Sequence, residues 1–275
     1  MINILFCGSK NVFDGVLTGA LSILKRSEND AYHFYIYTMD MTEMNPKFLP
    51  INEKQRLCLE KLVKEYNPES EVTLIDVKEI YTRELGGCPN EKAYCSPYTL
   101  IRLLADLVEG MPDKLLYLDC DIMFNRDVHL LYNYDIEKYE YAGAPDHYGK
   151  YTLLHRPLYL NAGVLLFNMK KCRETGLFAK ARGYLKKKKF LFADQTAIIK
   201  ATKKRKYLPQ KFNDQKFLHK WTVVRHFSKR LFWLPYPHTA NIKQWDIEKM
   251  HKIYKYHQFD DILDEYVKRK IEYED

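Results

Sequence analysis

Short apolar runs of strand length alternate along this chain with segments that have a helical period. Ile2–Cys7, Tyr32–Tyr37 and Val72–Val77 have the composition of buried strands, whereas Val16–Lys25 and Glu53–Tyr66 have the helical period. This order is typical of a βαβαβ unit, because parallel strands need a crossover connection. The N-terminal part therefore predicts an α/β fold that opens as a Rossmann-like, mostly parallel sheet.

The second half of the chain continues the alternation with shorter elements. Leucines recur at helical spacing over Tyr98–Val108, and Leu115–Leu118 is a continuous apolar run of the kind found in strands buried on both faces. A further strand is predicted over 161–168, then a basic helix over about 170–189 and a short helix over 194–200. These elements extend the central sheet and place helices on its flanks.

The last part of the chain has a different pattern. Residues 207–237 are rich in proline and aromatic side chains and predict loops, whereas 246–270 predicts one amphipathic, aromatic and basic helix. A chain of 275 residues can bury one sizeable core. We therefore expect one main domain over 1–240 and a C-terminal amphipathic helical appendage over 241–275.

The N-terminus and the cysteines indicate the compartment. Ile2–Cys7 is a short apolar stretch without a preceding basic residue, and a Gly-Ser-Lys turn follows it, which indicates a strand and not a signal peptide. No run approaches the roughly 18 to 20 apolar residues of a membrane-spanning helix. The dispersed cysteines lack the paired spacing of a zinc site. We expect a reduced, cytoplasmic protein, either soluble or peripheral at the inner membrane face.

The formal net charge of +8 is concentrated in Lys186–Lys189 and Lys203–Lys206. The simplest interpretation is a solvated helix face and its following loop, and the sharper one is attraction to phosphate-bearing partners. The sequence has no nucleic-acid recognition motif and no basic patch regularly interleaved with stacking aromatics, so we do not expect nucleic-acid binding. An anionic membrane surface is the better prediction.

Two carboxylates follow the apolar run Leu115–Leu118. If the strand continues, Asp119 and Asp121 point to one side and Cys120 points into the packing. Two carboxylates this close favour a cation between them, and a hard oxygen site suits Mg²⁺ or Mn²⁺. Asp-x-Asp pairs also cap turns by chance, but ligands of open α/β sheets bind at the carboxyl ends of strands. The position therefore predicts a divalent-metal site.

Several segments in this order resemble the family 8 glycosyltransferases, which include bacterial lipooligosaccharide galactosyltransferases and glycogenins. They are Tyr117-Leu118-Asp119-Cys120-Asp121, the preceding Arg102, and Asn161-Ala162-Gly163-Val164-Leu165-Leu166-Phe167-Asn168, and the similarity runs from Met1 to about Pro237. The resemblance implies a GT-A fold, a UDP-sugar donor, Mn²⁺, and transfer of a hexose with retention of anomeric configuration. A saccharide or lipid-linked acceptor in cell-surface glycan synthesis is the expected partner.

The resemblance also implies a third metal ligand beside Asp119 and Asp121. In the family it is a histidine in a His-aromatic-x-Gly segment that ends in Lys-Pro-Trp, and the matching position here is His226. On the residues alone, a histidine beside aromatics is more often a packed side chain. The segment Val224–Trp233 lacks the glycine and the Lys-Pro pair, so Lys229 or Arg230 is expected to hold the diphosphate.

The family places the loop after the first strand against the uridine. The residues that the resemblance assigns to donor binding in this loop and in the acidic motif are Cys7, Gly8, Ser9, Asn11, Asp119 and Cys120. Phe13 is expected to supply an aromatic ring for stacking. The alternative for the loop is an ordinary strand-to-helix turn.

Asp194 and Gln195 resemble the family's Asp-Gln segment, in which the aspartate holds sugar hydroxyls and the glutamine lies by the anomeric carbon. On the residues alone this is a good helix start, because aspartate is a favoured cap. Asn161 matches a sugar-binding position, and Arg102 matches a donor-contacting one. Phe212-Asn213 and the segment 145–159 are expected on the acceptor side.

These implied roles predict a mechanism. The departing diphosphate is stabilised by the metal, and the anomeric carbon gains oxocarbenium character. Because the amide of Gln195 is a poor nucleophile, we expect front-face substitution, in which the acceptor hydroxyl enters from the leaving-group side. Asp194 as a transient nucleophile is the competing hypothesis.

Three other functions stay open. A phosphohydrolase of the haloacid-dehalogenase type also has a strand ending in Asp-x-Asp, but it needs Thr or Ser where this chain has Met123, and Asp260-Asp261 fits its second acidic pair poorly. A non-catalytic sugar-nucleotide-binding protein is the second. Self-glycosylation on one of 22 tyrosines is less favoured, because tyrosine usually serves packing.

The segment Trp245–Lys270 allows two interpretations. It carries apolar and aromatic residues among lysines. A packed, partly exposed helix is the simpler interpretation, and a peripheral membrane contact that delivers a lipid-linked acceptor is the sharper one.

Overall fold

The apolar runs of the sequence form strands, and the segments of helical period form helices. The protein is described by a computed structural model that covers residues 1–27, 30–93, 97–149 and 158–274. Its strands are β1 (Ile2–Cys7), β2 (Tyr32–Thr38), β3 (Glu71–Asp76), β4 (Lys114–Leu118), β5 (Ile122–Phe124), β6 (Tyr141–Pro145), β7 (Leu160–Asn168), β8 (Arg205–Tyr207), β9 (Val224–His226), β10 (Arg230–Phe232) and β11 (His238–Ala240). Its α-helices are α1 (Phe13–Arg26), α2 (Glu53–Tyr66), α3 (Lys78–Leu85), α4 (His129–Tyr132), α6 (Met169–Thr175), α7 (Leu177–Lys187), α8 (Ala193–Ala201), α9 (Ile247–Lys249) and α10 (Asp260–Glu274). The tighter or wider turns are η1 (Lys10–Val12), η2 (Pro97–Thr99), η3 (Ile101–Leu104), η4 (Gln210–Phe212) and the π-helical η5 (Met250–Tyr254).

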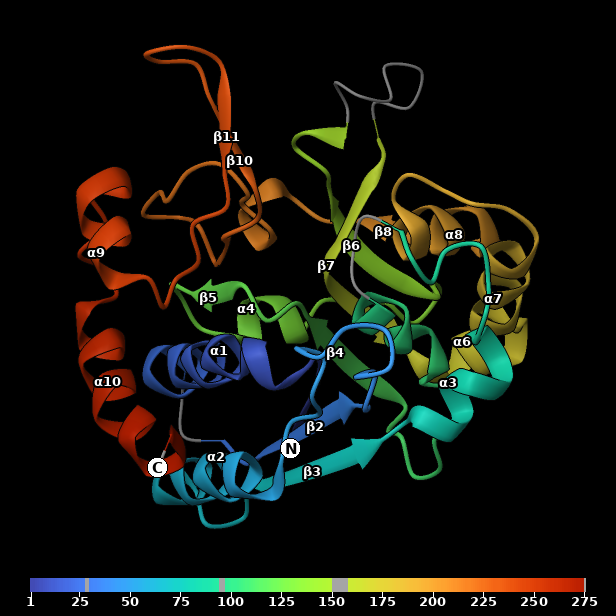
Figure 1. The fold of residues 1–275 in the computed structure, drawn as a ribbon, viewed down its shortest axis with the longest axis horizontal. Coiled ribbons are helices and arrows are strands. Elements are labelled where there is room, and N and C mark those ends of the chain that lie inside the picture. Colours follow the sequence, from blue (N-terminus) through green and yellow to red (C-terminus); the bar gives the residue numbers. More distant parts are fainter. Residues whose placement is uncertain (28–29, 94–96, 150–157, 275) are drawn as a thin grey trace.

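Seven strands make the central sheet, in the order β3-β2-β1-β4-β7-β6-β8, with helices on both faces (Figure 1). Strand β1 pairs in parallel with β2 and β4, and β2 pairs in parallel with β3. Strand β7 runs antiparallel to both β4 and β6. The mostly parallel α/β sheet that the sequence predicts is therefore confirmed.

Both faces of the sheet are buried, because side chains alternate along each strand. Ile4 and Phe6 of β1 belong to the apolar cluster covered by α1, α2 and α10. Leu5 and Cys7 belong to the cluster on the other face, covered by α3, α7 and α8. This double burial accounts for the continuous apolar runs in the sequence. It also fixes the strand ends, and with them the loops that follow β1 and β4.

Three predicted helices have different boundaries in the structure. The leucine pattern over Tyr98–Val108 forms the tight turns η2 and η3 in place of a regular α-helix. The basic helix predicted over 170–189 is divided into α6 and α7, because Gly176 adopts a left-handed conformation with φ of 65°. The single helix predicted over 246–270 is divided into α9, η5 and α10, with Lys255 at φ of 58° between the last two.

The C-terminal segment packs against the helices beside the N-terminal strands. Ile262, Leu263 and Tyr266 of α10 are buried in the same cluster as α1 and α2. The hydroxyl of Tyr273 donates to Asp14 Oδ1 at 2.5 Å. The boundary between a 1–240 domain and a 241–275 appendage stays a prediction, but these side chains share one core with the main sheet. In the described part of the chain, every helix is too short or too polar to span a membrane.

Candidate functional site

A cavity of about 600 Å³ opens at the carboxyl ends of β1 and β4. Its wall combines the loop after β1, the acidic turn after β4, the start of β7, the start of α8, and residues that follow β9. A volume of this size is in the range of sites that enclose small ligands. The structure thus places the candidate site where ligands bind in open α/β sheets.

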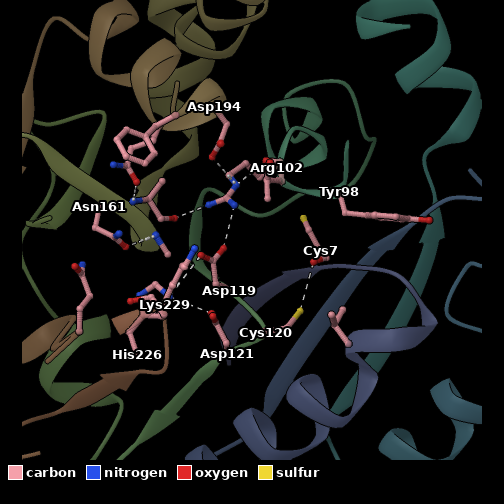
Figure 2. A pocket seen from close by; sticks show the side chains of 18 of the residues that line it. Cys7, Tyr98, Arg102, Asp119, Cys120, Asp121, Asn161, Asp194, His226 and Lys229 are labelled. Atoms are coloured by element: carbon pink, nitrogen blue, oxygen red, sulfur yellow. Dashed lines mark hydrogen bonds and ion pairs between the residues drawn. The ribbon is translucent and has the colours of Figure 1, made fainter. Parts of the chain in front are cut away.

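Asp119 and Asp121 lie in the turn that joins β4 to β5, not on a continuing strand. The two carboxylates nevertheless converge, because the turn folds both toward His226 (Figure 2). His226 Nε2 lies 3.0 Å from Asp121 Oδ1 and 3.9 Å from Asp119 Oδ2. One ligand atom from each of the three residues lies within 4.8 Å of the others. Two carboxylate oxygens and one imidazole nitrogen form a donor set that Mn²⁺ and Mg²⁺ accept.

His226 reaches this turn through strand pairing. Strand β9 pairs antiparallel with β5, in a register that sets His226 opposite Ile122, directly after the acidic turn. On the far side of the ring, Nδ1 lies 2.9 Å from Asn213 Oδ1. The amide oxygen accepts a proton from Nδ1, and this contact orients the ring so that Nε2 is directed at the carboxylates. Asn213 is fully buried and therefore orients a candidate ligand, instead of lining the acceptor side as the sequence predicted; Phe212 is also buried.

Two glycines allow the close approach of backbone around the acidic turn. A Cβ on Gly163 of β7 would lie 2.4 Å from His226 Cε1 and 2.8 Å from Asp119 Oδ2. A Cβ on Gly15 of α1 would lie 2.0 Å from the Cys120 carbonyl oxygen. Neither separation is compatible with a side chain at these positions. The geometry of the candidate metal site therefore requires glycine at positions 15 and 163.

Arg102 joins the acidic turn to the start of α8. Its guanidinium donates to Asp119 Oδ1 at 3.0 Å and lies 3.3 Å from Asp194 Oδ2 (Figure 2). It also donates to the Ala162 carbonyl oxygen at 2.5 Å and lies 4.0 Å over the ring of Tyr117. Only 2% of Arg102 is exposed. It lines the cavity and holds two carboxylates in place.

The charges at the site affect its carboxylates in opposite ways. Burial by itself raises the pKa of Asp121, but the charges and hydrogen bonds of Lys243 and His226 outweigh it and hold that pKa well below its usual range. For Asp194, burial raises the pKa, and the charge of Asp119 adds to this effect while Arg102 opposes it. Asp121 is therefore ionised at neutral pH. Ionisation of Asp194, in contrast, reduces the stability of the fold, because its charged form is buried.

Lys243 belongs to the site and was missed by the sequence interpretation. Its Nζ lies 2.5 Å from Asp121 Oδ2. It lines the cavity together with Trp245, which makes Lys243-Gln244-Trp245 a candidate counterpart of the family's Lys-Pro-Trp. The hairpin β10–β11 lies between His226 and this lysine in the chain, so the lysine is well separated from the segment directly after His226. Lys229 lines the cavity as well, whereas Arg230 is not among the lining residues.

Gln195, Asn161 and Asp146 form a second cluster on the cavity wall. Gln195 Oε1 accepts from the Ala162 amide at 3.0 Å, and its Nε2 donates to Asp146 Oδ2 at 3.1 Å. Asn161 Nδ2 donates to the same carboxylate oxygen at 2.9 Å. Asp146 therefore fixes both amides, although no sequence motif singled it out. Asp194 is the second residue of α8, after the N-cap Phe192, so its side chain is not a helix cap.

The loop after β1 contributes only part of the predicted donor contacts. Cys7, Gly8 and Ser9 line the cavity, as does Cys120, whose thiol donates to the Cys7 carbonyl oxygen at 3.4 Å. Burial raises the pKa of both thiols, so they are protonated and serve as apolar wall. Asn11 does not line the cavity, because its amide donates to the Lys47 carbonyl oxygen at 2.6 Å.

The predicted aromatic and acceptor-side residues have other places. Phe13 is fully buried against Tyr273, at 4.9 Å between ring centroids, so it is not available for stacking on a base. The rings of Tyr98 and Trp245 line the cavity. Of the acceptor-side segment predicted over 145–159, residues 150–157 lie outside the described part of the chain, and Tyr148 and Gly149 line the cavity.

The variant Asp194→Asn is expected to be more stable than the wild type at neutral pH. When the pKa of a carboxyl group is higher in the folded than in the unfolded protein, ionisation of the group destabilises the fold. The protein therefore loses stability as pH rises from the unfolded pKa, about 3.9, through the folded pKa. The asparagine does not ionise, so the stability difference should grow from about pH 4 toward neutral pH. Urea unfolding over this range measures it. A variant that is less stable than the wild type at every pH would contradict this account of Asp194.

Two sequence comparisons relate this chain to glycosyltransferases. A family model described as "Glycosyl transferase family 8" matches residues 3–225. A provisionally named glycosyltransferase of Haemophilus influenzae is 27% identical over 177 residues, which cover 61% of this chain and 49% of the relative. The chain thus spans about half the length of the curated relative it matches.

Solved structures show the same fold. The galactosyltransferase LgtC, in complex with donor and acceptor sugar analogues, has a TM-score of 0.68 at 17% identity over 96% of each chain. The bifunctional glycosyltransferase WbbM has a TM-score of 0.70 at 18% identity, covering 98% of this chain and 51% of WbbM. GlyE of Streptococcus pneumoniae has a TM-score of 0.63 at 17% identity, covering 98% of this chain and 65% of GlyE. The expected GT-A fold is confirmed.

Proposed function

The chain belongs to glycosyltransferase family 8, and on that premise we propose that it moves a hexose, glucose or galactose, from a UDP-sugar to a saccharide or glycolipid acceptor with retention of configuration. The observation that carries the proposal is the convergence of Asp119, Asp121 and His226 on one wall of the cavity, with Lys243 beside them. In this proposal the reaction takes place in the cytoplasm and contributes to the synthesis of cell-surface glycans.

In the proposed complex, Asp119, Asp121 and His226 hold Mn²⁺ or Mg²⁺. The bound metal supplies Lewis-acid stabilisation of the departing diphosphate. Lys243 lies against Asp121 and exchanges this contact for a phosphate oxygen when the donor enters, because an ammonium group contributes a charge-assisted hydrogen bond to either partner. The loop of Cys7, Gly8 and Ser9, with the ring of Tyr98, forms the wall that faces the nucleoside in this arrangement.

The sugar occupies the part of the cavity beside α8 in the same proposal. Asp194 accepts hydrogen bonds from sugar hydroxyls, and Asn161 contributes an amide from the head of β7. Gln195 lies near the anomeric carbon, and Asp146 fixes its amide at 3.1 Å. Because this amide is a poor nucleophile, the acceptor hydroxyl attacks from the leaving-group face and a phosphate oxygen receives its proton. One LgtC structure is described as an active-site mutant in which glutamate replaces glutamine, which supports a glutamine in this role.

The phosphohydrolase alternative has less support. Met123, where that chemistry needs a hydroxyl, is fully buried in β5. Asp260 and Asp261 lie at the start of α10, outside the cavity, and bind His251 and Arg26. A non-catalytic sugar-nucleotide-binding protein is the remaining candidate, since its site would hold the same donor.

A screen of UDP-sugars tests the proposal. The protein is incubated with each UDP-hexose and Mn²⁺, with Mg²⁺, or with a chelator, and release of UDP and transfer to saccharides are measured. Metal-dependent UDP release with UDP-glucose or UDP-galactose is the expected result. Donor binding without UDP release would favour the non-catalytic alternative, and phosphate release from simple esters would favour the phosphohydrolase.

Lys243→Gln is expected to raise the KM for the UDP-sugar by about tenfold or more, which corresponds to a lost charge-assisted contact of roughly 1.4 kcal/mol. Lys229→Gln is the matched control, because Lys229 lines the same cavity. The sequence predicted that Lys229 holds the diphosphate, whereas in the structure Lys243 is the lysine that contacts Asp121. The KM of Lys229→Gln should change less. Initial-rate kinetics of UDP release compare the two variants, and a larger effect of Lys229→Gln would reverse the assignment.

A further inference from the structure

A hairpin lies between His226 and Lys243 in the chain. Its strands are β10 and β11, which pair antiparallel from Arg230 opposite Ala240 to Phe232 opposite His238. Residues 233–237 connect them. In Figure 1 the hairpin projects well beyond the ribbon of the central sheet and its helices. The chain thus leaves one wall of the cavity, forms a protruding element, and returns to the same cavity at Lys243.

The tip of this hairpin is apolar and exposed. Trp233 is 69% exposed, Leu234 84% and Tyr236 67%. Single exposed apolar residues are common, but three large ones at the tip of a projecting element are not. Tryptophan and tyrosine combine an apolar ring with a polar atom, and both are enriched at the interface between lipid and water.

The base of the hairpin is anchored, so the exposure of the tip is not a result of loose packing. Phe232 stacks on His238 at 5.5 Å and on Tyr254 of η5 at 6.3 Å between ring centroids. The guanidinium of Arg230 lies 4.9 Å from the ring centre of Phe232 and 5.3 Å from that of Tyr254. These contacts hold the base against the body of the protein and present the tip to solvent.

The chain around the hairpin is positively charged and carries no acid. From Gln215 to Trp245 the sequence has no Asp or Glu. Arg225 is buried and Lys243 pairs with Asp121, so the cations that reach the surface here are Lys216, Lys220, Lys229 and Arg230. Beside the base of the hairpin, Phe217 is 44% exposed and has Lys216 and Arg230 at 4.9 and 5.8 Å from its ring centre. Apolar tips with adjacent cations complement a surface that is both apolar and anionic, which is the chemistry of a bilayer with acidic lipids.

The C-terminal helix does not offer this chemistry. Its apolar side is buried in the core, which leaves Val267 and Ile271 as its exposed large apolar residues. It also carries acidic residues along its length, which are Asp260, Asp261, Asp264, Glu265, Glu272 and Glu274. An acidic helix surface is repelled by anionic lipid. A membrane contact through α10, which forms part of the segment 245–270 that the sequence suggested, is therefore less favourable than one through the hairpin.

We propose that the tip of the β10–β11 hairpin, Trp233–Tyr236, inserts into the interfacial layer of a membrane that contains acidic lipids, with Lys216 and Arg230 binding the headgroups. The hairpin lies in the chain between His226 and Lys243, which both line the cavity. Contact of its tip with the membrane therefore holds the cavity next to the bilayer surface. This proposal concerns binding alone and does not rest on the proposed activity.

Sedimentation with vesicles tests the proposal on the full chain. The vesicles are phosphatidylcholine alone or phosphatidylcholine with about 30% phosphatidylglycerol, at low salt. The tip variant is Trp233→Ser with Leu234→Ser, and the matched control is Val267→Ser with Ile271→Ser on α10. The charge variant is Lys216→Gln, which should weaken binding to the anionic vesicles and leaves the Arg230 contacts at the base of the hairpin intact. Circular dichroism establishes that each variant is folded.

The wild type is expected to bind the anionic vesicles and to bind the neutral ones at least about tenfold more weakly. The tip variant should lose about tenfold or more in affinity, since two large apolar side chains no longer insert, while the α10 control stays within about twofold. In a Trp221→Phe, Trp245→Phe background, fluorescence of Trp233 should shift to the blue on binding. Absence of wild-type binding, an unaffected tip variant, or an unshifted Trp233 emission would each overturn the proposal.

Discussion

Replacing Gly163 by alanine is expected to lower both metal affinity and sugar transfer by about a hundredfold or more. The added Cβ would lie 2.4 Å from His226 Cε1 and 2.8 Å from Asp119 Oδ2, which is far inside van der Waals contact. Gly163 also accepts the backbone hydrogen bond of Asp119 at 2.8 Å, so the strand has little freedom to move away. The imidazole and the carboxylate must therefore separate, and a displacement of about 1 Å is enough to cost two orders of magnitude.

Calorimetric titration with Mn²⁺ and the rate of UDP release measure this effect. Gly183→Ala in α7 is the matched control, because nothing lies within 4 Å of a Cβ built there. The control should retain metal affinity, and its helix should gain about 0.5 to 1 kcal/mol, since alanine is favoured over glycine in helices. Unchanged metal affinity in a folded Gly163→Ala protein would show that Asp119 and His226 do not act together.

Replacing Arg102 by methionine is expected to reduce the free energy of unfolding by about 3 to 5 kcal/mol. The guanidinium bridges Asp119 and Asp194 at 3.0 and 3.3 Å, and its side chain is only 3% exposed. Its removal leaves the buried carboxylate of Asp194, the partly exposed carboxylate of Asp119 and the Ala162 carbonyl oxygen without their guanidinium partner. Loss of transfer should accompany the loss of stability, because Asp119 is a candidate metal ligand and Asp194 a candidate sugar ligand.

Arg173→Met is the control for the loss of an arginine ion pair as such. Arg173 pairs with Asp113 at 2.9 Å, but its side chain is 36% exposed and that of Asp113 is 74% exposed. Pairs of this kind contribute about 1 kcal/mol or less. Denaturant unfolding of both variants compares the two effects. Equal destabilisation by Arg102→Met and Arg173→Met would show that the buried bridge has no special weight in this fold.

The sequence determined the fold class and the outline of the candidate metal site. Continuous apolar runs require burial on both faces, so β1, β2 and β4 follow from composition and length alone. The acidic pair is recognisable because two carboxylates directly follow such a strand. His226 was reached only through the resemblance to a family, since one histidine among aromatics has no local pattern that distinguishes a ligand from a packed side chain.

Long-range contacts decided the rest, because they depend on how distant segments meet and not on local periodicity. Lys243 reaches Asp121 only because the chain returns to the cavity after the β10–β11 hairpin. Asp146 fixes Gln195 through a contact across 49 positions. In the same way, the aromatic ring of Phe13 is of a kind that can stack on a base, but it packs against Tyr273 and is not available at the site. The sequence by itself thus specified which strands form and where the carboxylates lie, whereas only the tertiary structure decided which side chains surround them.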